Sequence, residues 1–224
     1  MTFSLAALDR ETGMFGICVA SSSIAVGNRC PWARARAGAV LTQHRTDIRS
    51  GPLGLDLLSQ GFGAQEVVNI LVAGSEYPAQ RQFAVVDRDG HTAFYNGLGI
   101  ESINAAAAGD GCISVGNFLA SADVPEGMVR AFEASSGSFA ERLLSAVDAG
   151  VATGGEIQPA MAAALLIVDR HAWPLVDLRV DFEVDPQHGL HRLWKAYEPL
   201  VERFVIQVLR PFELKPLINS ALTV

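Results

Sequence analysis

Residues 2–21, TFSLAALDRETGMFGICVAS, set the architecture of this chain. Thr2 to Leu8 and Met14 to Ser21 are largely apolar runs of strand length, and the polar turn between them ends in Gly13. This pattern predicts a β-hairpin. Because the hairpin begins at the second residue, we expect the start of the chain to belong to a sheet rather than to a frayed end.

The rest of the chain alternates strands with pairs of helices. A third apolar strand is expected at Ala37 to Gln43, after a loop that contains Pro31 and Trp32. Pro199 should kink or split the last helix. The side chains of that helix that we expect to point inward are Leu190, Leu193, Trp194, Tyr197, Val201 and Phe204. We expect helices at 52–60, 64–72, 125–134, 138–149 and from 185 onward, and further strands at 82–87, 91–95, 112–115, 161–168 and 174–180.

This order differs from the regular strand–helix alternation that builds a parallel sheet. Hairpins separated by helix pairs suit two antiparallel sheets, each covered by helices on its outer face. We therefore predict an α+β fold, a four-layer αββα sandwich of two antiparallel sheets. Residues 1–224 are expected to form a single domain, in which residues from about 198 onward are a C-terminal helical extension.

Composition excludes several classes of protein. The formal charge is −7 and only two residues are lysine, which argues against a nucleic-acid partner. No basic segment followed by an apolar run stands at the start, and no stretch is long and apolar enough to span a membrane. The three cysteines lack C-x-x-C spacing, so they are expected to be reduced thiols in a cytoplasmic protein.

Cofactor and metal motifs are missing from the sequence. Gly97-Leu98-Gly99 lacks the rest of a dinucleotide fingerprint, and neither a Walker loop nor an H-E-x-x-H motif is present. His188 and His191 are three residues apart but have no further ligand at fixed spacing. We expect no metal and no cofactor.

Thr2 is the most informative candidate for catalysis. A small residue after Met1 permits removal of the methionine, which leaves a chain that begins with threonine. Such a residue carries a nucleophilic hydroxyl and an α-amine whose ordinary pKa is about 7.7–8.0. The amine is therefore partly neutral and can take the proton from the hydroxyl. Many chains begin with Met-Thr without this chemistry, so the sequence leaves both possibilities open.

Polar residues at predicted strand ends are candidates for substrate binding, because sites often lie where strands give way to loops. Gln43, His44 and Arg45 follow the third strand, and Arg81 opens a later one. An ordinary polar loop and a structural ion pair are the alternatives. His44 and Asp47, which lies three residues further on, could also form an oriented base.

Two further polar groups stand near strand ends. Ser21 and Ser23 close the second strand, near the start of the first, and their hydroxyls could bind a substrate or cap the turn. Gly116 and Asn117 follow the strand at 112–115 and could offer a backbone N–H and a side-chain amide to a developing oxyanion. Alternatively, Gly116 and Asn117 simply form a turn, which both residue types favour.

Several segments together resemble a bacterial family known as "domain of unknown function 1028". The resemblance covers roughly residues 2 to 197 and is specific as a set. The segments that carry it are Thr2–Asp9, Glu11–Gly13, Gly16–Ser21, Ala25–Gly27, Pro31–Ala35, Gly38–Gln43, Gly51–Leu58, Arg81–Gln82, Val85–Asp87, Gly116–Asn117 and Asp177–Asp181.

This resemblance implies a fold like that of N-terminal-nucleophile (Ntn) hydrolases, with Thr2 in the position of the nucleophile. The chain departs from the family pattern at Asn96 to Gly111, which is rich in alanine, and at His44 and Arg45, where small or apolar residues are expected. The tail after Val201 is an extension. These departures leave the substrate undefined.

Three hypotheses follow for function. The first is an amidohydrolase that cleaves a small amide-type C–N bond, with Thr2 as nucleophile after removal of Met1 and Asn117 as oxyanion donor. The second is a non-catalytic protein that retains the fold and serves in metabolite binding or assembly. The third is a hydrolase that uses Cys112 or His44.

A homo-oligomer is also expected. The segment after Pro199 carries more apolar surface than one helix face can bury internally, which indicates a partner surface. The residues concerned are Phe204, Val205, Ile206, Val208, Leu209, Phe212 and Leu214.

Overall fold

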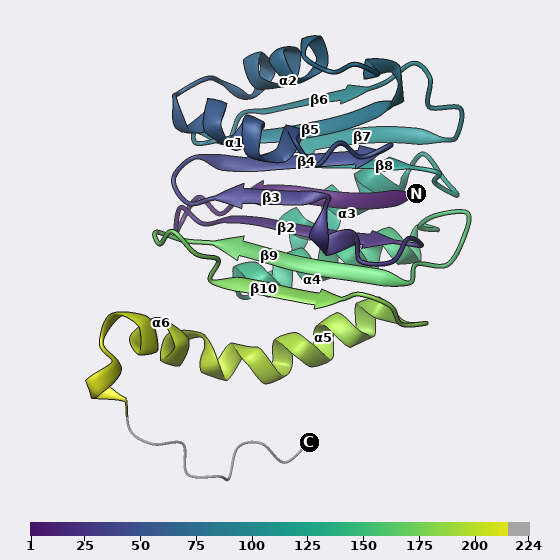
Figure 1. Ribbon diagram of the computed structural model, residues 1–224. Coiled ribbons are helices and arrows are strands. Elements are labelled where there is room, and N and C mark those ends of the chain that lie inside the picture. Colours follow the sequence, from purple (N-terminus) through teal and green to yellow (C-terminus); the bar gives the residue numbers. More distant parts are fainter. Residues whose placement is uncertain (215–224) are drawn as a thin grey trace.

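The computed structural model describes residues 1–214, which form two antiparallel sheets and the helices packed against them (Figure 1). The predicted α+β class with two antiparallel sheets is therefore confirmed. The larger sheet has the order β10-β9-β2-β1-β8-β7. Its strands are β1 (Thr2–Leu8), β2 (Phe15–Ser21), β7 (Asn104–Gly109), β8 (Cys112–Asn117), β9 (Ala162–Val168) and β10 (Val176–Val180).

The smaller sheet has the order β3-β4-β5-β6 and is built from β3 (Pro31–Arg34), β4 (Gly38–His44), β5 (Arg81–Asp87) and β6 (Thr92–Asn96). The longer helices are α1 (Ser50–Ser59), α2 (Ala64–Ala73), α3 (Val124–Ala134), α4 (Phe139–Ala152), α5 (Pro186–Tyr197) and α6 (Val201–Leu209). Short 3-10 helices complete the chain at η1 (Val26–Asn28), η2 (Pro78–Gln80), η3 (Glu198–Leu200) and η4 (Pro211–Glu213).

The opening hairpin lies in the middle of the larger sheet, as Figure 1 shows. β1 pairs with β2 on one side and with β8 on the other, and Thr2 stands directly opposite Asn117. Every residue of β1 is buried. The start of the chain is thus held by two neighbouring strands, which confirms the expectation drawn from its sequence.

Three of the four apolar clusters within residues 1–214 join the sheets to each other and to the helices. One packs the face of the larger sheet that carries Phe3 and Leu5 against α3, α4 and α5. A second lies between the two sheets and joins Ala6 and Ile17 to Leu41. The third packs Val40 and other residues of the smaller sheet against α1 and α2. Alternation along each strand places successive side chains in different clusters.

Gly150 allows α4 to lie close to β1. A Cβ atom at this position would come within 2.7 Å of the Phe3 ring. Glycine therefore brings the helix near the backbone of the strand that begins at Thr2, and a larger side chain would have to push the two elements apart.

Two strands were not predicted from the sequence. The expected loop at Pro31 and Trp32 is the strand β3, and the alanine-rich segment that had no assignment contains β7. Both lie at an edge of a sheet. Proline is tolerated at the first position of an edge strand, and alanine has a weak preference for strands, so pairing with β4 and β8 decides these two elements.

The last helix is split at Pro199, as expected, into α5, η3 and α6. Leu190 is buried, and Trp194 and Tyr197 pack against the core of the larger sheet. The prediction that Leu193 and Phe204 also point inward was wrong, because they are 39% and 38% exposed. α6 has no buried residue, since it lies beyond the sheets (Figure 1).

No helix within residues 1–214 combines the length and the apolar character needed to cross a membrane.

Candidate active site

Thr2 begins β1 on the face that looks toward the smaller sheet, and it is only 5% exposed. The side chains of β1 that point between the sheets are apolar at Leu8 and Ala6 and polar at Ser4 and Thr2. The space between the sheets is therefore apolar at one end and polar at the other. Thr2 lies at the polar end.

Met1 covers the Thr2 hydroxyl. The Thr2 Oγ1 donates to the Met1 carbonyl oxygen and lies 3.5 Å from the Ser21 Oγ. The Ser21 hydroxyl donates to the same carbonyl at 2.5 Å and accepts from the Ser23 backbone N–H at 3.0 Å. Removal of Met1 would free both hydroxyls, because their shared acceptor would leave with it.

A buried hydrogen-bond network joins the two sheets beside Thr2. The Ser4 hydroxyl donates to Gln43 Oε1 at 2.8 Å, and Gln43 Nε2 donates to Gln82 Oε1 at 2.6 Å. Gln82 Nε2 donates to the Gly116 carbonyl at 2.8 Å, and Asn117 Nδ2 donates to Gln82 Oε1 at 2.9 Å. These bonds fix the direction of each amide, because a carbonyl can only accept.

The network leaves polar atoms without partners at this end of the molecule. Within residues 1–214, Asn117 Oδ1, Ser22 Oγ and Glu156 Oε1 are buried and lack a hydrogen-bond partner. Leaving a buried acceptor unpaired costs about 1–3 kcal/mol, so such atoms need an explanation. Their gathering around the start of β1 favours a site that binds something.

A pocket of about 380 Å³ opens directly against Met1. It is lined by the end of β4, by residues that directly precede β1 or follow β4 and β8, and by the loop after β2. Its lining residues are Met1, Ser23, Arg29, His44, Arg45, Thr46 and Phe118. Thr2 itself is not among the lining residues, although its neighbour Met1 is.

His44 and Phe118 face each other in this pocket. Their rings are stacked with centroids 5.7 Å apart. Both residues have positive φ, 63° for His44 and 55° for Phe118, in the left-handed region. Non-glycine residues adopt this conformation at a cost of about 1–3 kcal/mol and only where the surroundings impose it. The pocket wall is therefore built on strained backbone.

The hydrogen bonds of His44 define its tautomer. Nδ1 lies 2.9 Å from the Gln80 carbonyl and must donate to it, so Nε2 of the neutral ring is an acceptor. Burial lowers the pKa of His44 below its ordinary value of 6.5, and the nearby positive charges of Arg45 and Arg81 act in the same direction. The ring is therefore neutral at pH 7.

The two predicted arginines have different surroundings. Arg45 is exposed and lines the pocket. Arg81 lies outside the pocket lining, where its guanidinium donates to the Arg45 carbonyl and is 3.9 Å from the Asp47 carboxylate. Asp47 is thus paired with arginines and does not contact His44, so the hypothesis of a His44–Asp47 base has no support in the geometry. Arg29, which the sequence did not suggest, supplies the second basic side chain of the pocket.

Glu156 is a buried carboxylate that sequence reasoning missed. It is 7% exposed and comes from the loop after α4, 134 residues away from its partner Ser22. The Ser22 N–H donates to its Oε2 at 3.0 Å. Burial raises the pKa of Glu156. No motif marks this residue, because only the folded chain brings it to the start of β1.

The amine at the start of the chain is also perturbed. Burial lowers the pKa of the Met1 amine, and the negative charge of Glu156 is the main opposing influence. Cys30 acts in the same direction as Glu156, whereas Arg29 and Arg45 lower the pKa further. A terminal amine in this place is closer to neutral at pH 7 than a solvated one.

Cys112 does not fit the role of nucleophile. It is fully buried on the face of β8 that packs against α3 and α4, away from the face that carries Asn117. Burial raises the pKa of its thiol to about 12. The reactive thiolate is therefore not populated near neutral pH.

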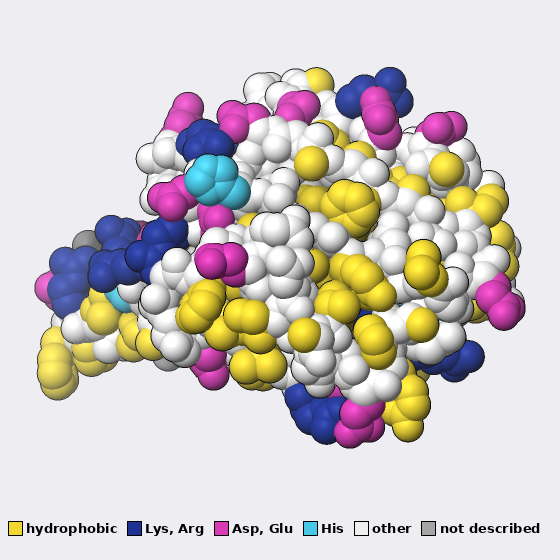
Figure 2. Space-filling model, turned by 90° about the horizontal axis from the view of Figure 1, so that it is seen from above, with side chains coloured by type: hydrophobic (Ala, Val, Ile, Leu, Met, Phe, Trp, Pro, Cys, Tyr) yellow, Lys and Arg dark blue, Asp and Glu magenta, His cyan; other side chains and the backbone are white. Residues whose placement is uncertain are grey.

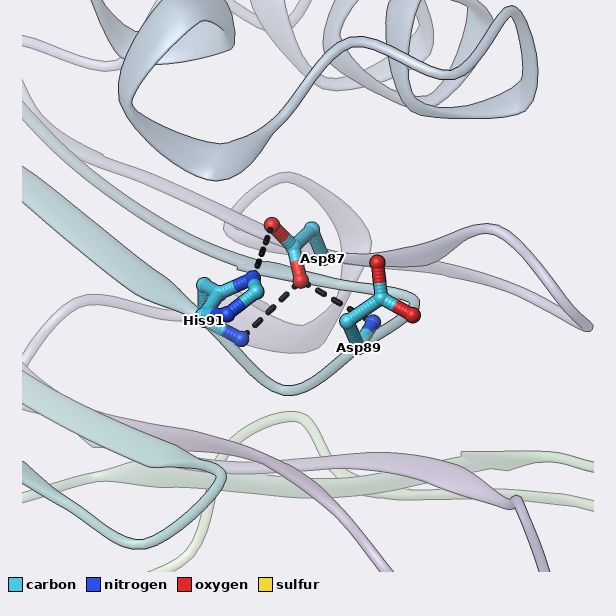
Figure 3. Close-up of side chains that lie close together, drawn as sticks. All are labelled: Asp87, Asp89 and His91. Atoms are coloured by element: carbon cyan, nitrogen blue, oxygen red, sulfur yellow. Dashed lines mark hydrogen bonds and ion pairs between the residues drawn. The ribbon is translucent and has the colours of Figure 1, made fainter.

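Asp87, Asp89 and His91 lie close together in the turn between β5 and β6 (Figure 3). Asp87 Oδ1 accepts from the backbone N–H groups of Asp89 and His91, and its Oδ2 accepts from the Ala64 N–H. These hydrogen bonds satisfy the buried Asp87 carboxylate, which therefore links the turn to the start of α2.

The family model for "Family of unknown function (DUF1028)" matches residues 2–190. The chain belongs to this family. A crystal structure of a DUF1028 protein from Silicibacter pomeroyi is similar at a TM-score of 0.82 and 30% identity, over 88% of this chain and 85% of that one. No curated protein shows significant similarity.

A more distant structure is Anbu, an ancestral beta-subunit, from Yersinia bercovieri, at a TM-score of 0.38 and 10% identity over 91% of this chain and 96% of that one. That likeness is too weak to support a conclusion. The DUF1028 match contains Thr2, Asn117 and Glu156, whereas α6 lies after its end. The candidate site thus belongs to the family part of the chain.

Proposed function

We propose that this DUF1028 protein is an N-terminal-nucleophile amidohydrolase that cleaves a small amide-type C–N bond. The observation that carries the proposal is the place of Thr2: it starts a central strand, it is buried, and its hydroxyl binds the carbonyl of Met1, which lines a pocket. Helices on the outer faces of two stacked sheets support assignment to the four-layer αββα sandwich of such hydrolases.

In this proposal, removal of Met1 leaves Thr2 with a free α-amine. The amine takes the proton of the Thr2 hydroxyl while Oγ1 attacks the acyl carbon, and the C=O bond opens to an oxyanion. The C–N bond then breaks, and the proton passes from the amine to the leaving nitrogen. Water attacks the resulting ester through the same amine, which releases a carboxylic acid and restores the hydroxyl.

Asn117 is the proposed oxyanion donor. It lies opposite Thr2, and one N–H of its Nδ2 is already committed to Gln82, which holds the amide in place. The second N–H of the same nitrogen is then the donor. Gly116 supports this arrangement through the bond between its carbonyl and Gln82. Preorganised donors of this kind are worth several kcal/mol in the transition state.

The pocket favours a substrate that bears a carboxylate. Arg29 and Arg45 line it and give it positive charge, while Ser23 adds a hydroxyl. His44 presents an acceptor, Nε2, next to these cations. Gln43 and Ser21 lie deeper, where they hold the network and the Thr2 hydroxyl. Arg81 acts in this proposal by positioning the Arg45 backbone.

The proposal predicts that activity depends on processed Thr2. Purified chain should be screened against small carboxylate-bearing amides, with intact mass measured to separate chains with and without Met1. We expect hydrolysis only by chains that lack Met1. Thr2→Val keeps the branched shape but removes the nucleophile, and should reduce the rate by at least about 10³-fold.

Thr2→Ser is the matched control, because it retains a hydroxyl and an amine at the same position. It should keep measurable activity. Full activity of Thr2→Val, or of chains that carry Met1, would contradict the proposal.

A non-catalytic protein is the second candidate. The observation in its favour is the Met1 carbonyl, which engages the hydroxyls of Thr2 and Ser21 and leaves neither free. A binding protein would take up the same carboxylate-bearing amides with equal affinity in wild type and Thr2→Val, without turnover.

We also propose a homo-oligomer in which α6 is part of the contact. Apolar side chains of α6 and η4 are exposed, and Figure 2 shows hydrophobic side chains at the tip of the projecting end of the molecule. Phe204, Val208, Leu209 and Phe212 are the residues concerned.

A further inference from the structure

Glu156 lacks a charged side-chain partner. Within residues 1–214 no arginine, lysine or histidine lies within ion-pair distance of its carboxylate. Buried charges are normally paired, because an unpaired one costs several kcal/mol. Within residues 1–214 the terminal amine forms no ion pair with Glu156 either, but its positive charge acts on the carboxyl and opposes the increase in pKa that burial causes.

The loop after β2 holds this carboxylate in a defined orientation. The Ser22 backbone N–H binds Oε2, which leaves Oε1 buried and without a partner. Ser22 follows Ser21, whose hydroxyl contacts the Thr2 hydroxyl. An ammonium or amine at the start of β1 would satisfy Oε1, since it offers N–H donors to an acceptor that has none.

We propose that Glu156 is a positioning residue that acts as the counter-ion of the chain's terminal amine and holds it at the start of β1. Its role in turnover rests on the proposed function, whereas its electrostatic effect on the amine does not. In the processed chain the same carboxylate would hold the Thr2 amine beside the Thr2 hydroxyl. Its negative charge would offset the effect of burial, so that the amine remains a strong enough base to take the hydroxyl proton.

Other charged groups face the same amine. Arg29 and Cys30 come from the segment between η1 and β3, and His44 and Arg45 come from the end of β4. The arginines disfavour its protonated form. Cys30 is buried and its pKa is raised by burial, so it carries little negative charge at neutral pH. Glu156 is therefore the group whose removal should change the amine most.

The test measures the pKa of the terminal amine directly in the full-length protein. The rate of acylation of the amine by a small anhydride is followed against pH by peptide mass spectrometry, with Lys195 as an internal reference. Glu156→Gln should lower the amine pKa by about 1, the lower end of the effect of a nearby opposite charge. An unchanged amine pKa would overturn the inference.

Two controls separate charge from local structure. Glu202→Gln removes a negative charge from the exposed α6 and should leave the amine pKa as in wild type. Glu156→Asp keeps the charge but shortens the side chain, and should give a smaller decrease than Glu156→Gln. Glu156→Ala also removes the charge and serves as the test variant if Glu156→Gln does not fold; an unchanged amine pKa in that variant would then count against the inference.

Turnover provides a separate readout. If Thr2 is the nucleophile, the acid limb of the pH–rate profile should move to lower pH in Glu156→Gln by the same amount as the amine pKa, with a lower maximal rate. A shifted amine pKa in a protein without any amidase activity would support the counter-ion and contradict only the proposed function.

Discussion

Several polar atoms at the start of β1 are buried and share or lack hydrogen-bond partners. Thr2 and Ser21 share one acceptor, the Met1 carbonyl, and three nearby buried atoms have no partner within residues 1–214. Buried polar groups without hydrogen-bond partners destabilise a fold, so they are rare outside functional sites. We infer that the region is organised for an amine, a water molecule or a substrate rather than for stability.

His44 gives a prediction for pH dependence at this scale. Burial lowers its pKa in the folded protein below 6.5, its ordinary value. Below about pH 6.5 the unfolded chain therefore binds a proton that the folded chain does not yet bind, so stability falls as pH falls toward the folded pKa. Below that folded pKa, His44 adds no further change.

The measurement is the free energy of unfolding in urea from pH 8 to pH 5 for wild type and His44→Gln. The wild-type value should fall more steeply below pH 6.5 than that of the variant. A variant slope equal to or steeper than the wild-type slope would rule out a lowered pKa of the partly buried His44 ring.

At the scale of elements, three strand ends build the polar end of the space between the sheets. β4 supplies Gln43, β5 supplies Gln82 and β8 supplies Asn117. Gln43 and Asn117 could be predicted from the sequence, because each is a polar residue at the end of an apolar strand. Gln82 was noted only as part of the family resemblance, because nothing local indicates that four hydrogen bonds meet at its amide.

This network predicts a large loss of stability in Gln82→Leu. The substitution leaves the Gly116 carbonyl and the Asn117 amide buried without their partner. We expect the free energy of unfolding to fall by about 2–4 kcal/mol, measured by urea denaturation. Gln65→Leu is the control, because the Gln65 amide binds Asn69 on the exposed face of α2 and its loss should cost no more than about 0.5 kcal/mol. Equal losses in the two variants would refute the network.

For the whole molecule, the exposed apolar residues of α6 predict self-association. In Figure 1 this helix projects from the body, and Val208 is 57% exposed. Sedimentation of the full chain should give more than one protomer, and Phe204→Glu with Val208→Glu should reduce it to a monomer, because buried charge opposes apolar contact.

Gln207→Glu adds one charge at an exposed polar position of the same helix and should leave the assembly intact. A monomeric wild-type chain at all concentrations would exclude this use of α6.

The amino-acid pattern alone determined the opening hairpin, the antiparallel sheets and most helices, because periodicity and turn residues act locally. It also singled out Thr2, Asn117 and His44. Tertiary structure alone decided that β3 and β7 are strands and that Leu193 remains exposed. It also decided that Glu156 lies beside Ser22, 134 residues away. Such outcomes depend on which surfaces meet after the chain folds back on itself, and no local pattern in the sequence carries that information.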